Sequence, residues 1–140
     1  IFVINTSLVW LLGFIAIWRS KCHDFPVLAM SGIILVNAIS HTVLGIVKFA
    51  YNPGLLTSIV IFIPLALFFY RHHLQHQREA KKEVVASLIW AVLAHVIMVL
   101  GLVGANWYHL FPQSWYFVAL ILWSCLPAFL FNGHKKMLTS

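Results

Sequence analysis

Three polar side chains lie inside long apolar stretches of this 140-residue chain, and their types make them the best candidates for chemistry. Asn37 and His41 are four residues apart, which puts them on one face of a helix, and His95 lies in a later apolar stretch. Two histidines on different helices suit a metal ion such as zinc, iron or manganese, or the axial ligation of a haem or a chlorophyll-type pigment. The simpler alternative is that these side chains only form hydrogen bonds between helices.

The composition indicates what kind of element must position these side chains. Of the residues, 62% are hydrophobic and 9% are charged, and the mean hydropathy is +0.94. A soluble domain is nearer half apolar and a quarter charged, so an ordinary soluble enzyme and a disordered chain are excluded. The net charge of +6 is carried between the apolar stretches. The expected partners are therefore the lipid bilayer and other membrane subunits, and no nucleic acid.

The apolar stretches predict an all-α, polytopic transmembrane helix bundle of about five spans that forms a single domain. A helix needs about 20 apolar residues to cross the hydrocarbon core, whereas membrane strands are shorter and alternate in polarity. Pro64 and Pro127 lie inside two of the stretches and predict kinks rather than breaks. The predicted spans cover about residues 1–18, 26–50, 54–70, 84–105 and 114–131.

Charge predicts the orientation of these spans. With five spans, eight of the nine basic residues fall on one side of the membrane, and only Lys48 falls on the other. The positive-inside rule then places the C-terminus in the cytoplasm and residue 1 outside, in an inner or cytoplasmic membrane. Residues 1–18 are apolar with no basic segment before them. We therefore expect that residue 1 lies within a membrane helix and that a further N-terminal segment precedes it.

Depth along these spans decides whether the polar side chains can meet. Counted from the inner end at 1.5 Å per residue, Asn37 and His95 lie roughly 17 Å deep and His41 roughly 22 Å deep. The three side chains are therefore expected near the middle of the membrane. None of the three acidic residues lies within a predicted span. A carboxylate-bridged dimetal site or a carboxylate general base is therefore not expected from these spans alone.

Two other polar or aromatic segments have simple interpretations. The histidines of residues 71–79 have a spacing similar to the histidine boxes of membrane-bound di-iron oxygenases, but there is only one such box. A basic juxtamembrane helix in contact with anionic headgroups is the favoured explanation. The uncharged segment 106–113 and its flanks predict an aromatic belt at the outer surface, and small residues nearby predict close helix approach. The belt residues are Trp107, Tyr108, His109, Trp115 and Tyr116, and the small residues are Gly101 and Gly104.

The order of several short segments is similar to that of a known family. Asn37-Ala38-Ile39-Ser40-His41 is followed by Tyr51-Asn52-Pro53-Gly54-Leu55-Leu56-Thr57-Ser58 and then by Ile63-Pro64. This pattern resembles the HXXEE-domain family of small multi-helix membrane proteins over about Phe2 to Tyr70. The His-x-x-Glu-Glu motif that names the family does not occur in this sequence and is expected upstream of Ile1, where it would supply carboxylates. The resemblance implies Asn37 and His41 as functional positions and leaves open whether the protein is an enzyme.

Two functional hypotheses follow from these observations. The first is an HXXEE-type membrane protein with a buried metal site, in which His41 is a ligand, Asn37 orients a ligand or water, and His95 contributes from another helix. The second is a non-catalytic subunit of a larger respiratory or photosynthetic membrane complex, in which His41 or His95 holds a haem or a chlorophyll-type pigment. A transporter is less favoured, because the spans lack charged pathway residues and repeated halves.

Overall fold

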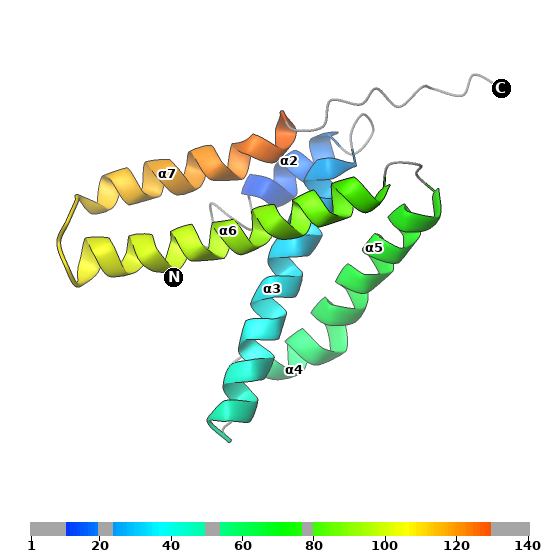
Figure 1. Cartoon of the computed structure of the whole chain (residues 1–140), viewed down its shortest axis with the longest axis horizontal. Coiled ribbons are helices and arrows are strands. Elements are labelled where there is room, and N and C mark those ends of the chain that lie inside the picture. The colour runs from blue at the N-terminus through cyan, green and yellow to red at the C-terminus, as the bar shows by residue number, and fades with distance from the viewer. Residues whose placement is uncertain (1–10, 20–23, 50–53, 77–79, 130–140) are drawn as a thin grey trace.

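The computed structural model of the chain describes residues 11–19, 24–49, 54–76 and 80–129. Every regular element within these residues is helical, which confirms the predicted all-α class (Figure 1). Three helices are long and apolar enough to cross a membrane, namely Phe25–Val47, Leu55–His76 and Ala80–Asn106. Residues 1–10 of the first predicted span and residues 130–131 of the fifth lie outside the described residues.

The elements follow one another with short connections. The chain forms α2 (Leu12–Arg19), α3 (Phe25–Val47), α4 (Leu55–Thr57), the π-helical turn η2 (Ser58–Phe62), α5 (Ile63–His76), α6 (Ala80–Asn106), α7 (Gln113–Cys125) and the 3₁₀ turn η3 (Leu126–Ala128).

The segment from α4 to α5 passes Pro64 as one helix without a break. Proline has no N–H, and its ring clashes with the carbonyl four residues earlier in a regular α-helix. The turn before it widens instead, so that the Ile63 N–H donates to the Ser58 carbonyl five residues back. The helix continues to His76, six residues past the apolar stretch that ends at Tyr70, because polar residues also form helix while hydropathy detects only the apolar part.

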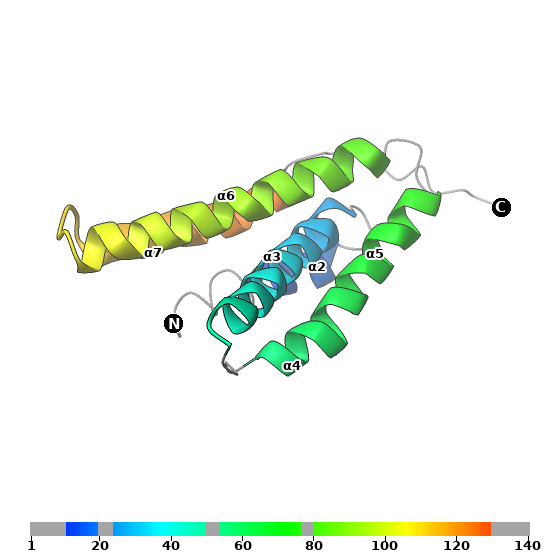
Figure 2. The same ribbon diagram turned by 60° about the horizontal axis from the view of Figure 1, so that its bottom comes forward.

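Helix α3 lies at the centre of the bundle, where α6 crosses it and α5 runs beside it (Figures 1 and 2). The crossing is tight because Gly32 of α3 has no side chain. A Cβ at Gly32 would lie 2.9 Å from Ala91 Cβ and 3.1 Å from the Ser87 carbonyl. The Tyr70 hydroxyl of α5 reaches the same point, 3.2 Å from the Leu28 carbonyl and 3.2 Å from Ser87 Oγ. Three helices thus share one contact, which we call the Gly32 crossing.

The second tight contact joins α6 to α7, which pack as a hairpin (Figure 1). The Tyr116 ring lies across Gly101, where a Cβ would be 2.6 Å from Tyr116 Cε2, and the Tyr116 hydroxyl donates to the Met98 carbonyl at 3.1 Å. The predicted close approach at Gly101 is confirmed. The prediction that Tyr116 belongs to the surface belt is wrong, since only 3% of it is exposed, whereas Trp107 and Trp115 are 78% and 73% exposed.

Beyond the crossing, α3 and α6 separate towards their C-terminal ends in both views (Figures 1 and 2). The later half of α3 and much of α5 therefore leave large apolar side chains exposed, among them Val43, Ile46, Leu67 and Phe68. A continuous apolar exterior of this kind is expected where a helix faces lipid. It also places the C-terminal half of α3 beside α4 and η2 rather than beside α6.

Candidate functional site

His41 lies on α3 beside the start of α4. Its Cε1 atom is 3.7 Å from the point that a Cβ at Gly54 would occupy. Gly54 has a φ of +95°, a left-handed conformation that favours glycine, and it opens α4. The structure therefore brings together two of the segments that carry the family resemblance, residues 37–41 and 54–58. Residues 51–53 of the same motif lie outside the described residues.

Ser58 adds a polar group to the same seam. It is 1% exposed, and its hydroxyl has no hydrogen-bond partner among the described residues. Helices α3 and α4–α5 run antiparallel, with Gly54 beside His41 and Tyr70 at Leu28. This register puts Ser58 level with Asn37, which is half-buried one turn before His41. We call Asn37, His41, Gly54 and Ser58 the His41 seam.

His95 lies on α6, which diverges from the part of α3 that contains His41. It is four residues beyond Ala91 at the Gly32 crossing, about 6 Å along α6, while His41 is nine residues beyond Gly32, about 14 Å along the diverging α3. The His95 Nδ1–H donates to the Ala91 carbonyl at 2.9 Å, and in the neutral ring with this tautomer Nε2 carries the lone pair. The structure thus groups Asn37 with His41 and does not bring His95 to them. Across the described ranges, no group of three or more His, Cys, Asp or Glu side chains is placed to hold a metal ion.

A second polar cluster, which the sequence does not reveal, lies at the other end of α3. His73 of α5 is 6% exposed and stands between two carboxylates. Its Nε2 is 2.7 Å from Glu83 Oε2 at the start of α6, and its Nδ1 is 3.8 Å from Asp24 Oδ2 at the start of α3. We call these three residues the inner-end triad. The sequence gives one indication of this cluster, which is that the chain has only three acidic residues. Two of them surround this imidazole.

The other two histidines of α5 lie next to the triad on the exposed side of the helix. The rings of His72 and His76 stack with centroids 4.3 Å apart, and the His76 Nδ1–H donates to the His72 carbonyl at 2.7 Å. Together with Asp24 and His73 of the triad they border a cavity of about 240 Å³. Its lining is Asp24, Val27, Leu28, Phe69, His72, His73 and His76.

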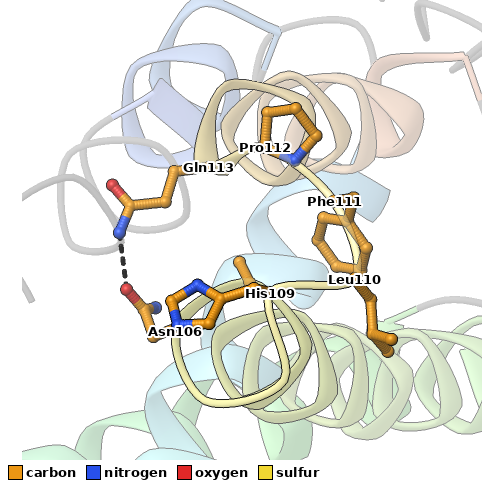
Figure 3. Close-up of a pocket in the computed structure, with 7 residues that line it drawn as sticks. Asn106, His109, Leu110, Phe111, Pro112 and Gln113 are labelled. Carbon is orange, nitrogen blue, oxygen red and sulfur yellow. Dashed lines mark hydrogen bonds between the residues drawn. The ribbon is translucent and has the colours of Figure 1, made fainter.

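A larger, open cavity of about 480 Å³ lies at the turn between α6 and α7 (Figure 3). The Gln113 side chain donates to Asn106 Oδ1 across its mouth, and the His109 ring stands beside Asn106 (Figure 3). Apart from Ala105, the residues that line it are exposed, and none of them carries a carboxylate or a thiol. The cavity therefore belongs to the surface of the turn and offers weaker chemistry than the two clusters above.

The fold and the composition define the class as a helical membrane protein, with three helices that can cross a bilayer. Residues 1–69 match the family model described as a protein of unknown function with HXXEE motif, which confirms the predicted resemblance to this family. No curated protein and no solved structure matches the chain. The His41 seam lies wholly within the matched residues, whereas His73, Glu83 and His95 lie beyond them.

Proposed function

We propose that this protein is a multi-pass membrane protein of the HXXEE family that binds a transition-metal ion at the His41 seam. The observation that carries the proposal is the position of the His41 ring, 3.7 Å from where a Cβ at Gly54 would lie, because it brings two separate family segments to one point of the bundle. The Ser58 hydroxyl in the adjacent π turn supports it, because this group is buried and has no hydrogen-bond partner within the described part of the chain. Single π turns inside helices are frequent at functional sites.

The donor atoms of the seam favour particular ions. An imidazole nitrogen from His41 with amide and hydroxyl oxygens from Asn37 and Ser58 suits zinc, iron or manganese. A four-coordinate shell needs one more ligand than these three side chains provide. With three protein ligands and an open position, such an ion would polarise a bound water or carbonyl.

Metal content tests this proposal directly. We expect near-stoichiometric zinc, iron or manganese by elemental mass spectrometry of the full-length protein in detergent. We expect at least about tenfold less bound metal in His41→Ala, and a smaller loss of metal in Asn37→Ala. His109→Ala is the matched control, because His109 is exposed at the α6–α7 turn and its replacement leaves the seam intact. A wild-type protein without metal, or a His41→Ala protein that keeps it while unfolding at the normal temperature, would overturn the proposal.

The second candidate function is that of a subunit of a larger membrane complex that carries a tetrapyrrole on His95. It is favoured by the Nδ1–H bond to Ala91, which leaves Nε2 free to act as an axial ligand. The visible spectrum of the same sample separates the two functions. A Soret or chlorophyll-type band that disappears in His95→Ala would support the subunit, and a featureless spectrum would reject the pigment.

We propose further that the end of the bundle with the inner-end triad faces the cytoplasm of an inner or cytoplasmic membrane. Arg71, Lys81 and Lys82 are exposed at this end, and Lys48 lies at the far end of α3. The C-terminus would then be cytoplasmic. A reporter that is active only in the cytoplasm, fused after Ser140, is expected to be active. An inactive reporter on an expressed and folded fusion would reverse the orientation.

A further inference from the structure

Two exposed histidines lie one turn apart near the end of α5. His72 and His76 are four residues apart, so their Cβ atoms are about 5–6 Å from each other on one helix face. Their imidazole rings stack with centroids 4.3 Å apart and planes 21° apart. Both side chains are exposed, whereas the neighbouring His73 is buried. Two histidines with this spacing on one helix face are an arrangement that binds a transition-metal ion such as zinc.

A hydrogen bond determines which nitrogen of His76 can bind a metal. Its Nδ1 is 2.7 Å from the His72 carbonyl oxygen. A carbonyl oxygen only accepts, so Nδ1 carries the hydrogen, and in the neutral ring Nε2 carries the lone pair. Histidines that ligate metals almost always donate their other ring N–H in this way, which holds the ring and its tautomer in place. His76 therefore already has the form that a metal ion requires.

The surroundings of the pair favour a cation and leave room for water. Both side chains border the cavity of about 240 Å³, and none of the described residues that line it is a lysine or an arginine. Arg71 precedes the pair in the sequence but does not line this cavity. The pair also lies in the last turns of α5, and the partial negative charge at a helix C-terminus attracts cations. His73 is not a third ligand, because its Nε2 is 2.7 Å from Glu83 Oε2.

We propose that His72 and His76 chelate a divalent transition-metal ion through one ring nitrogen each, which is Nε2 in His76. Imidazole suits copper, nickel and zinc, and Cu²⁺ is expected to bind most tightly. Two protein ligands leave the other coordination positions to water, so the ion has open positions for a further ligand. The pair is a smaller site than a group of three or more ligands, none of which occurs in the described ranges.

This site is separate from the His41 seam and does not depend on it. Asp24 lines the same cavity as the pair, and His41 lies 17 residues further along α3, which corresponds to about 25 Å of helix. The two sites therefore cannot share one ion. Either of them can be changed by mutation without replacing a residue of the other.

The experiment is a titration of the full chain in detergent with Cu²⁺, followed by electron paramagnetic resonance. We expect a saturable component whose spectrum shows coupling to two imidazole nitrogens. Because linking two ligands raises affinity by a factor on the order of 100 over either alone, His72→Gln and His76→Gln should each weaken this component about 100-fold. The double variant should lose little more than either single variant. Any metal at the His41 seam is common to all of these proteins, so the differences between them report on the pair alone.

His109→Gln is the matched control for these variants. His109 is also an exposed histidine, but it has no second histidine within four residues of it in the sequence. Its replacement should leave the titration unchanged. Without metal, all of the variants should unfold at the temperature of the wild type, because the replaced rings are exposed.

Three results would overturn the proposal. The first is a wild-type protein without a saturable Cu²⁺ component. The second is equal weakening by His109→Gln, which would show adventitious binding to any exposed imidazole. The third is a loss in each single variant that doubles in the double variant, which would show two independent ligands. Because these variants leave the His41 seam intact, such results are distinguishable from a failure of the seam proposal, which the His41→Ala protein tests.

Discussion

Gly32→Ala is expected to lower the free energy of unfolding by about 2–3 kcal/mol, since overpacking a tight core contact costs this much. The added methyl group would lie 2.9 Å from Ala91 Cβ, 2.9 Å from the Tyr70 hydroxyl and 3.1 Å from the Ser87 carbonyl. The Ala91 Cβ and the Ser87 carbonyl belong to or adjoin the backbone of α6. The clash is therefore relieved only if α3 and α6 move apart. That movement would also weaken the Tyr70 hydrogen bonds. Denaturant or thermal unfolding in mild detergent, followed by tryptophan fluorescence, measures the loss.

Gly13→Ala is the control for this prediction. The same methyl group added to α2 meets one atom at 3.7 Å, and alanine is the better helix former. It should leave stability unchanged or slightly raised. Equal stabilities for the two variants would contradict the close crossing of α3 and α6.

Gly101→Ala should lower the free energy of unfolding by about 2 kcal/mol, because its methyl group would enter the buried ring of Tyr116. The ring atoms affected lie near the middle of the side chain, so a small rotation of its tip does not relieve the clash. Displacing the ring would also break the hydrogen bond from the Tyr116 hydroxyl to the Met98 carbonyl. The same unfolding measurement applies.

A double variant tests whether Tyr116 is the cause. Tyr116→Leu alone loses aromatic packing and a hydrogen bond, but it opens space over Gly101. The cost of Gly101→Ala should therefore be smaller in the Tyr116→Leu background, and the difference is the coupling energy between the two sites. Strictly additive costs would show that Gly101 is needed for another reason.

Hydropathy was enough to predict the class of the fold, because the bilayer demands long apolar helices and three of them are present. It was not enough to predict where helices end. The helix through Tyr70 continues to His76, since polar residues sustain a helix that a hydropathy profile no longer detects. The burial of Tyr116 escaped prediction for a related reason. An aromatic residue near the membrane surface is by default an anchor, and only its tertiary contact with Gly101 shows otherwise.

The candidate sites, like the fold, could be predicted only in part. The spacing of Asn37 and His41 predicts one helix face, and α3 contains both. Their neighbour Ser58 was not predicted, because helix rotation is unreadable where nearly every position is apolar. His72 and His73 are adjacent in the sequence, yet His72 is exposed and His73 is buried between two carboxylates. Such a difference depends on how three helix ends meet, and composition carries no information about it.

The π turn at residues 58–62 sets the rotational phase of the helix that contains it. In a regular α-helix each residue turns about 100°, so positions 54 and 70 would point about 160° apart, towards nearly opposite neighbours. The extra residue in the wide turn removes about 100° of this difference, leaving about 60°. One nearly straight helix can then present Gly54 to His41 and Tyr70 to Leu28, both on α3. Deleting a single residue within this turn would leave a regular α-helix with its two ends still in phase, because fifteen steps of about 100° also leave about 60°. A regular α-helix that kept all of these residues would instead put its two ends out of phase.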